Sequence, residues 1–149
     1  MFIPDSLYRQ ILPVMPIPCV DLLVVDRLRN ILLLKRRNDP AKGLWWVPGG
    51  RIHMGETRAA SAARKLREEC GMDLQHNPPR EISTEDLFLP IGQGAISHTI
   101  CTVFLVEVGA GAPVVLDSQS DASAWRTAQD WRAEDLHPYV RKIVSYGLA

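Results

Sequence analysis

Residues 50–72, GRIHMGETRAASAARKLREECGM, decide which fold and which chemistry are expected of this chain. A helix is predicted from Thr57 to Cys70, because threonine is a favourable N-cap and Gly71 favours a C-terminal stop. One side of this helix is apolar, formed by residues that recur at helical spacing: Ala59, Ala60, Ala63, Leu66 and Cys70. The segment therefore predicts a helix that packs on a core and leaves its charged residues off the apolar stripe.

Carboxylates gather around this predicted helix. Glu68 and Glu69 lie near its end, Glu56 precedes its first turn, and Pro48-Gly49-Gly50 forms a loop with free backbone carbonyls. Neighbouring helical residues are about 100° apart, so Glu68 and Glu69 point in adjoining directions. Mg²⁺ prefers such hard oxygen ligands, and Arg64 can hold Glu68 in an i,i+4 pair. The spacing therefore predicts a magnesium site beside the helix.

This segment resembles the Nudix box, with matches at Gly50, Glu56, Arg64, Leu66, Glu68, Glu69, Gly71 and Met72. The resemblance implies an α+β fold, a Nudix-type α/β/α sandwich with a mixed β-sheet. It also implies a hydrolase that uses Mg²⁺, with Mn²⁺ as an alternative. One position departs, because Lys65 stands where the family has glutamate. A protonated ammonium cannot ligate Mg²⁺, and Lys65 is spaced to pair with Glu69.

Residues 20–22, 34–38 and 40–51 resemble one group within this family, the GDP-mannose mannosyl hydrolases. Those enzymes also lack the second glutamate of the box, and they release sugar and GDP by attack at the anomeric carbon. The resemblance implies that Arg36 and Arg51 clamp the diphosphate and that Asp21 lies in the sugar-nucleotide pocket. The implied metal ligands are the Gly50 carbonyl and Glu69, with Gln119 as a third, beside the Glu56 and Glu68 of the box.

The general base is less well defined. The GDP-mannose group carries Gln-His where this chain has Gln119-Ser120, and a serine hydroxyl is a poor base at pH 7. His98, at the start of a predicted strand, is one replacement and Asp121 is another. A hydrogen-bonded strand histidine and a surface-loop aspartate are the alternative interpretations. With His98, the residues predicted to act in catalysis are Arg36, Arg51 and Arg64.

Three functions therefore remain open from the sequence. The first is hydrolysis of a nucleoside diphosphate sugar of the GDP-mannose type, releasing sugar and GDP. The second is pyrophosphohydrolysis of a nucleoside diphosphate derivative or nucleotide at phosphorus. The third, motivated by Lys65 and Ser120 together, is a nucleotide-binding domain with weak catalysis. All three predict a small-molecule nucleoside diphosphate derivative as the partner.

The rest of the chain alternates short apolar segments with turns, and its length favours one domain spanning residues 1–149. Helices are predicted at 6–12 and 136–146. Strands are predicted at 19–25, 31–34, 44–47, 82–89, 99–108, 114–116 and 124–126. One of the adjacent Trp45 and Trp46 is expected in the core and the other beside the pocket. Strands mixed with a few helices support the α+β class.

Composition narrows the partners and the location. The 17 basic and 17 acidic residues give a net charge of zero, which does not favour nucleic acid. The first 16 residues contain neither a charged leader nor an uninterrupted apolar run, so no membrane partner and a cytoplasmic location are expected. The three cysteines are expected to be reduced core thiols. Phe2, Ile3, Leu7 and Ile11 form an apolar set that favours a homodimer weakly.

Overall fold

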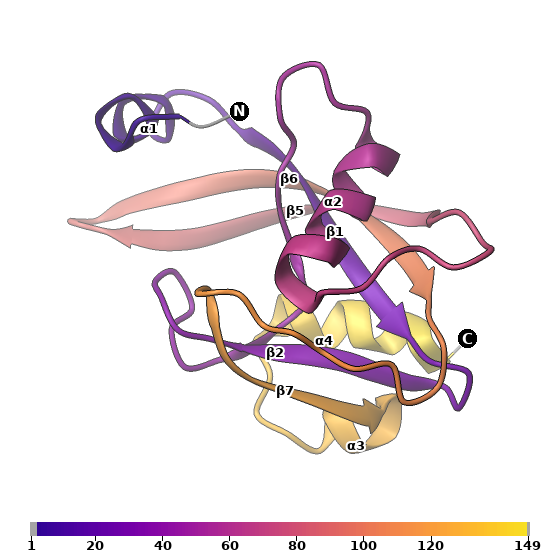
Figure 1. The fold of residues 1–149 in the computed structure, drawn as a ribbon. Helices are drawn as coiled ribbons and strands as arrows, with labels where there is room; N and C mark the ends of the chain where they lie inside the picture. The colour runs from indigo at the N-terminus through magenta and orange to yellow at the C-terminus, as the bar shows by residue number, and fades with distance from the viewer. Residues whose placement is uncertain (1–2, 149) are drawn as a thin grey trace.

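The computed structural model describes residues 3–148, and its helices lie on both faces of a mixed β-sheet (Figure 1). Helix α2 covers one face, and helices α3 and α4 cover the other. The elements are α1 Asp5–Ile11, β1 Ile17–Val25, β2 Asn30–Arg36, β3 Trp45–Trp46, β4 Gly49–Arg51, α2 Arg58–Cys70, β5 Arg80–Gly92, β6 Ala95–Glu107, β7 Ser120–Thr127, α3 Ala128–Arg132, α4 Pro138–Ser145 and the 3-10 turn η1 Tyr146–Leu148. This arrangement confirms the predicted α+β sandwich.

The sheet is mixed because β1 and β6 run parallel while the other pairs are antiparallel. Its strand order is β3-β2-β1-β6-β5, with β4 also paired to β1 and β7 to β2. Strands β1 and β2 are registered only at Val25 and Ile31. Beyond that pair β1 is hydrogen bonded to β4 and β6, and β2 is hydrogen bonded to β3 and β7. In the β1–β4 ladder Gly49 is aligned with Asp21 and Gly50 with Val20. The glycine pair is thereby fixed against the central strand.

Strand β1 is buried on both faces, which explains its continuous apolar sequence. Val20, Leu22 and Val24 belong to the cluster beneath α2, while Leu23 and Val25 belong to the cluster beneath α3 and α4. The sheet therefore separates two hydrophobic cores. Each core anchors one helical layer.

Helix α2 ends where the sequence predicts. The Thr57 hydroxyl accepts a hydrogen bond from the Ala60 N–H at 3.1 Å, and Gly71 adopts a left-handed conformation with φ 67°. The predicted apolar stripe needs correction, because Ala59 and Ala60 are exposed. The buried stripe is instead four-residue spaced and comprises Ala62, Leu66 and Cys70. Small alanines on both sides of the helix do not distinguish its buried side from its exposed side.

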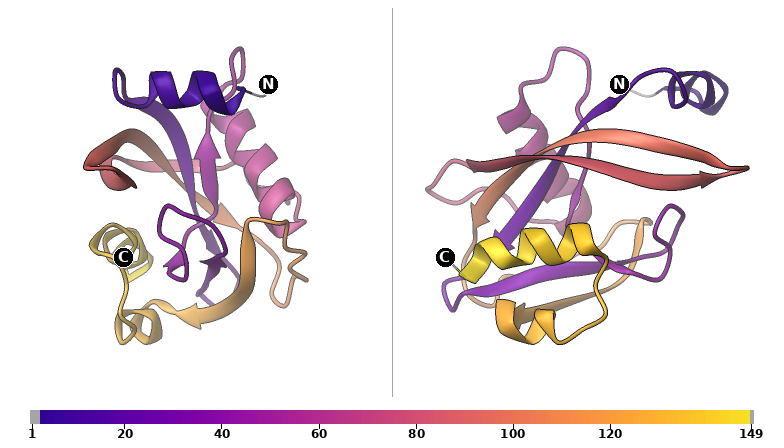
Figure 2. Two further views of the ribbon diagram at one scale, coloured as in Figure 1. Left: turned by 90° about the vertical axis from the view of Figure 1, so that its left-hand side faces the viewer. Right: turned by 180° about the vertical axis from the view of Figure 1, so that it is seen from behind.

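Both of the other predicted helices and all of the predicted strands except one are present, with small differences in their bounds. The predicted strand at 114–116 is wrong, since this segment forms no ladder and instead joins helix α2 through a Val115 N–H to Cys70 carbonyl bond of 2.9 Å. Residues 90–98, which lie outside the predicted strands, instead extend both strands into the end of the β5–β6 hairpin, which projects from the body of the molecule (Figure 2). Helix α3 was not predicted.

Further predictions concern single residues and the termini. All three cysteines are free and buried, as predicted. Within residues 3–148, no helix is both long enough and apolar enough to cross a membrane. Phe2, part of the apolar set that favours a homodimer, lies outside the described residues. Leu7 is exposed on α1, and Ile11 packs partly on the core.

Candidate active site

Arg64 on helix α2 is the centre of a hydrogen-bond network among the carboxylates. Its Nε and Nη2 atoms donate to the two oxygens of Glu56 at 2.7 and 3.0 Å, and its Nη1 donates to Glu68 at 3.1 Å. Nη2 also donates to the Arg51 carbonyl at 3.0 Å. This fork geometry ties helix α2 to strand β4 and to the loop between them. Arg64 thus orders the carboxylates.

A second group forms around Glu69, one residue further along α2. The Gly49 N–H donates to Glu69 Oε2 at 2.7 Å, and the Lys65 ammonium lies 3.5 Å from the same oxygen. The ammonium is also 3.4 Å from Glu68 Oε2. Glu69 is buried, with only 6% of its side chain exposed. The Lys65–Glu69 pair expected from the spacing is therefore present.

The two glycines of β4 are needed because both faces of this strand are occupied. A Cβ on Gly49 would lie 2.0 Å from Asp21 Oδ1, and one on Gly50 would lie 3.0 Å from Lys65 Cε. Gly49 therefore faces β1 and Gly50 faces helix α2. Any side chain at Gly49 would displace the central strand or the Asp21 carboxylate.

The three carboxylates of the box differ electrostatically. Burial raises the pKa of Glu69 above its usual value, and the Lys65 ammonium and the Gly49 N–H act in the opposite direction. Burial also acts to raise the pKa of Glu68, but Lys65 and Arg64 outweigh it and the net shift is downward. The hydrogen bonds from Arg64 are the main cause of the pKa of about 2 at Glu56. Glu56 is therefore a fixed anion, while the charge on Glu69 depends on its cationic neighbours.

Arg36 and the loop before β7 also act on this cluster. Arg36 lowers the pKa of Glu69, and Asp117 is among the groups that raise it, after burial. Gln119 lies beside them, because the Arg37 N–H donates to its carbonyl at 2.9 Å. Asp117 was not predicted as a site residue. The polar turn Asp117-Ser118-Gln119 could have suggested a site residue from the sequence. Its position near Glu69 depends on the pairing of β2 with β7, which the sequence does not reveal.

Arg51 and Asp21 lie on the opposite face of the sheet from α2. Asp21 is 6% exposed and accepts a short hydrogen bond from the Tyr139 hydroxyl of α4. Burial is the largest cause of a pKa well above its usual value at Asp21. Arg51 is the ladder partner of Cys19, whose pKa is raised by a hydrogen bond with Cys101 and by burial, with Arg51 acting in the opposite direction. The structure therefore brings Arg36 and Asp117 within electrostatic reach of Glu69. Asp21 also feels the charge of Glu69, but its carboxylate is hydrogen bonded to Tyr139 in the opposite layer.

None of the predicted bases meets the carboxylates. His98 is cross-strand partner to Phe88, stacks on its ring at 4.4 Å and lies 2.9 Å from Asp86 Oδ1. On β6 it is five residues from Val103, the partner of Asp21, so it lies about 16 Å from the level of Gly49 at the usual strand rise.

The other candidate base, Asp121 near the start of β7, is also engaged elsewhere. Asp121 pairs with Arg37 at 2.6 Å, and Ser120 is buried. The alternative interpretations of His98 as a strand histidine and of Asp121 as a surface residue describe this arrangement best.

The two tryptophans of β3 both pack inward. Trp46 is buried against Tyr139 and His137, with ring centroids 5.8 and 5.2 Å away. Trp45 contacts the Trp131 ring at 5.2 Å. The expectation that one of them lines the pocket is not supported, because both contact the layer formed by α3 and α4.

The donors present suit a hard cation. Glu68, Glu69 and the backbone at Gly50 offer oxygen atoms of the kind that Mg²⁺ prefers. Both oxygens of Glu56 are already bonded to Arg64, and among residues 3–148 no three His, Cys, Asp or Glu side chains converge closely enough to form a complete metal site. The set therefore fits an ion that takes its remaining ligands from water and substrate phosphate.

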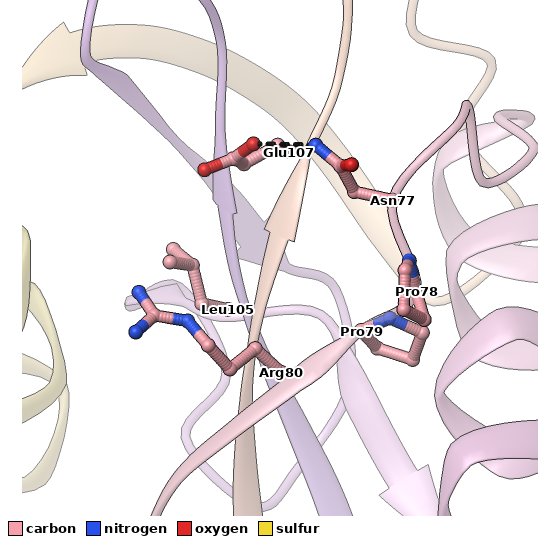
Figure 3. A pocket seen from close by; sticks show the side chains of 6 residues that line it. All are labelled: Asn77, Pro78, Pro79, Arg80, Leu105 and Glu107. Carbon is pink, nitrogen blue, oxygen red and sulfur yellow. Dashed lines mark hydrogen bonds between the residues drawn. The ribbon is translucent and has the colours of Figure 1, made fainter.

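Two hollows in the described surface lie away from this cluster. One of about 370 Å³ is lined by Asn77, Pro78, Pro79, Arg80, Leu105 and Glu107. Figure 3 shows Asn77 donating to Glu107, at 3.0 Å, across its rim. A neighbouring hollow of about 360 Å³ shares Arg80, Leu105 and Glu107. Neither is lined by a residue of the predicted site, so the carboxylate cluster is identified by its chemistry and not by a deep cavity.

Comparison with known proteins gives a consistent picture. The family model described as NUDIX domain matches residues 15–146. The low-salt glycan biosynthesis protein Agl8 of Haloferax volcanii is 39% identical over 145 residues, covering 95% of this chain and 88% of that protein. An ADP-ribose pyrophosphatase of Methanocaldococcus jannaschii is 29% identical over 99 residues, covering 66% of this chain but only 56% of that protein. A MutT protein from Methanosarcina mazei has the same fold, with a TM-score of 0.74, 23% identity and coverage of 90% and 94% of the two chains.

Proposed function

The chain belongs to the Nudix family, and from this premise we propose that it is a Mg²⁺-dependent hydrolase of a nucleoside diphosphate linked to a sugar. The observation that carries the proposal is the carboxylate cluster on helix α2, in which Arg64 fixes Glu56 and Glu68 while Gly49 and Lys65 hold Glu69. Such a cluster can bind a divalent ion and, through it, a diphosphate.

Two relatives support the sugar-linked substrate class. The M. jannaschii protein is named for ADP-ribose, which is a nucleoside diphosphate joined to a sugar, and the H. volcanii protein is named for glycan biosynthesis. Within this class GDP-mannose is the substrate that the sequence resemblance favours.

Each residue of the cluster has a proposed task. Glu68, Glu69 and the Gly50 carbonyl hold Mg²⁺, which neutralises charge on the diphosphate when bound. Arg36 binds the diphosphate, for which its planar guanidinium is suited. Gln119, in the loop before β7, is proposed as a further ligand of the metal ion.

Cleavage at phosphorus is a second candidate for the bond broken. Two observations favour it over release of free sugar. Of the two residues that could serve as the base for attack at the anomeric carbon, His98 lies beyond the end of β1 and away from Gly49, and Asp121 is paired with Arg37. In addition, one relative is named a pyrophosphatase. Under this reaction GDP-mannose would give GMP and mannose 1-phosphate.

Incubation with GDP-mannose or ADP-ribose in ¹⁸O-labelled water tests the proposal and distinguishes the two bonds. Hydrolysis that requires Mg²⁺ and stops on addition of EDTA is the expected result. Label in free sugar indicates attack at carbon, and label in a phosphate product indicates attack at phosphorus. Binding of both compounds without turnover would contradict the proposal and favour a nucleotide-binding domain.

A further inference from the structure

The Lys65 side chain occupies the middle of the proposed metal site. Its Nζ atom lies 3.4 Å from Glu68 Oε2 and 3.5 Å from Glu69 Oε2, and only 14% of the side chain is exposed. A lysine on a helix surface normally extends its ammonium into water. Here the ammonium bends back onto both carboxylates.

Gly50 completes the surroundings of this ammonium. A Cβ at Gly50 would come within 3.0 Å of Lys65 Cε and 3.2 Å of Nζ, so the lysine lies directly against the glycine backbone. Glu68, Glu69 and Gly50 are the three groups proposed to ligate Mg²⁺. The single positive charge of Lys65 is therefore placed among the same donors.

The charge balance of the cluster depends on Lys65. Glu69 is almost fully buried, and a buried carboxylate without a counter-charge is costly. Arg64 cannot supply that charge, because its nitrogens are bonded to Glu56, Glu68 and the Arg51 carbonyl. Among the ion pairs of the described residues, the partner of Glu69 is Lys65, whose ammonium lies 3.5 Å from the carboxylate.

We propose that the Lys65 ammonium is a built-in cation that takes the place of one divalent ion between Glu68 and Glu69. This inference rests on the proposed function in that these carboxylates are the metal ligands. The site consequently binds one divalent ion fewer than it would with a neutral or acidic residue at position 65. Lys65 acts through the two carboxylates and is a positioning residue.

The number of Mn²⁺ ions bound per chain tests the inference without any substrate. Free Mn²⁺ is measured by electron paramagnetic resonance during titration of the wild type, Lys65→Gln, Lys65→Glu and Lys65→Arg. We expect one additional Mn²⁺ per chain in the Gln and Glu variants, tighter in the Glu variant because it adds a carboxylate ligand. The Arg variant keeps the positive charge and should bind as many ions as the wild type.

Arg67→Gln is the matched control. It removes one positive charge from the same helix, where Arg67 pairs with Asp73 at the surface, and should leave the Mn²⁺ count unchanged. Because Lys65→Gln leaves Glu69 without its partner, the melting temperature is also recorded with and without Mn²⁺. A larger Mn²⁺-induced rise in the Lys65→Gln and Lys65→Glu variants than in the wild type supports the inference.

Equal Mn²⁺ counts and equal thermal shifts in all the folded proteins would overturn the inference. That result would leave the proposed function standing if the wild type hydrolyses GDP-mannose or ADP-ribose. Conversely, an extra Mn²⁺ in the Lys65→Gln variant together with an inactive wild type would support the inference and contradict the proposed function. The Mn²⁺ titration and the hydrolysis assay therefore test the inference and the proposed function independently.

Discussion

Glu69 is the residue on which the proposed chemistry depends most directly. In Glu69→Gln the side-chain carbonyl can still accept the Gly49 N–H, but the anionic ligand is lost. We expect kcat with Mg²⁺ to fall by more than about 100-fold while the fold is retained. Steady-state kinetics and circular dichroism measure the two effects. Glu81→Gln, an exposed partner of Arg58, is the control and should keep full activity.

The paired Arg64 and Glu56 predict a dependence of stability on acid. The pKa of Glu56 in the folded chain is about 2, below its ordinary value of 4.5, so the ionised carboxylate stabilises the fold above pH 4.5. This contribution is lost as the pH falls from 4.5 toward 2. In Arg64→Gln we expect a loss of about 1–3 kcal/mol at pH 7 and a smaller loss at pH 3.

Urea unfolding of the wild type and of Arg64→Gln at the two pH values measures this difference. The control is Arg67→Gln, which breaks an exposed ion pair and should cost less than about 0.5 kcal/mol at either pH. An equal loss at pH 7 and pH 3 in Arg64→Gln would contradict the assigned role of Glu56.

Local spacing predicted the residues of helix α2 well. The i,i+4 relation anticipated both the Arg64–Glu68 and the Lys65–Glu69 pairs, because a helix brings those positions together whatever the rest of the chain does. The bidentate Arg64–Glu56 bond joins residues outside that relation. It depends on the path of the loop, which no periodicity records.

At the scale of elements, the end of helix α2 gives a sharp test. Gly71 has φ 67°, and a Cβ there would lie 2.7 Å from Val115 Cβ, whereas Gly55 has φ 79° with nothing within 4 Å of an added Cβ. Gly55→Ala therefore measures backbone strain alone, expected at about 1 kcal/mol. Gly71→Ala should cost more, because the residue 115 segment must also move. Chemical denaturation of both variants compares the two, and equal losses would exclude the clash.

Elements with strong local signals were predicted and those with weak signals were not. The caps Thr57 and Gly71 fixed helix α2, and the long apolar run 99–108 fixed most of β6. The segment 114–116 has the β-branched composition of a strand but has no ladder partner, because it turns to cap α2. The five-residue helix α3 is too short to leave a periodic pattern.

At the scale of the whole molecule, Asp21 and Tyr139 connect the central strand to the C-terminal helix. Burial raises the pKa of Asp21, so its contribution to stability is greatest below its ordinary value of 3.8 and is lost as the pH rises through the folded-state pKa. The Tyr139 hydrogen bond opposes this rise. We expect Tyr139→Phe to cost about 1–3 kcal/mol at pH 8 and less at pH 4.

Thermal unfolding at both pH values measures the effect. Tyr146→Phe provides the comparison, because Tyr146 donates to Glu85, which Lys142 also binds. The remaining ion pair should limit its cost, and the cost should not grow between pH 4 and pH 8. If Tyr139→Phe lowers the free energy of unfolding equally at pH 4 and pH 8, Asp21 does not change its ionisation between these two pH values.

Long-range placement explains why the site was predicted only in part. Arg36 and Gln119 are 83 positions apart, and the antiparallel β2–β7 ladder pairs Arg36 with Ser120, the neighbour of Gln119. The resemblance places Asp21 in the pocket, and His98 is a candidate to replace the missing base. The parallel β1–β6 register instead leaves His98 beyond the end of β1 and directs Asp21 into the core. Register between distant strands is not encoded in any short stretch of sequence.

The bare backbone of Gly50 beneath Lys65 also has an evolutionary consequence. Lysine and glutamate codons differ only at their first base, so one nucleotide substitution exchanges these two amino acids. A glutamate at this position is shorter than the lysine and would meet no side chain at position 50. A gene for this chain is therefore a single mutational step from encoding the acidic residue that the family carries at this position. The Gly50 backbone leaves room for that side chain, and a further divalent ion would have to replace the charge of the lysine.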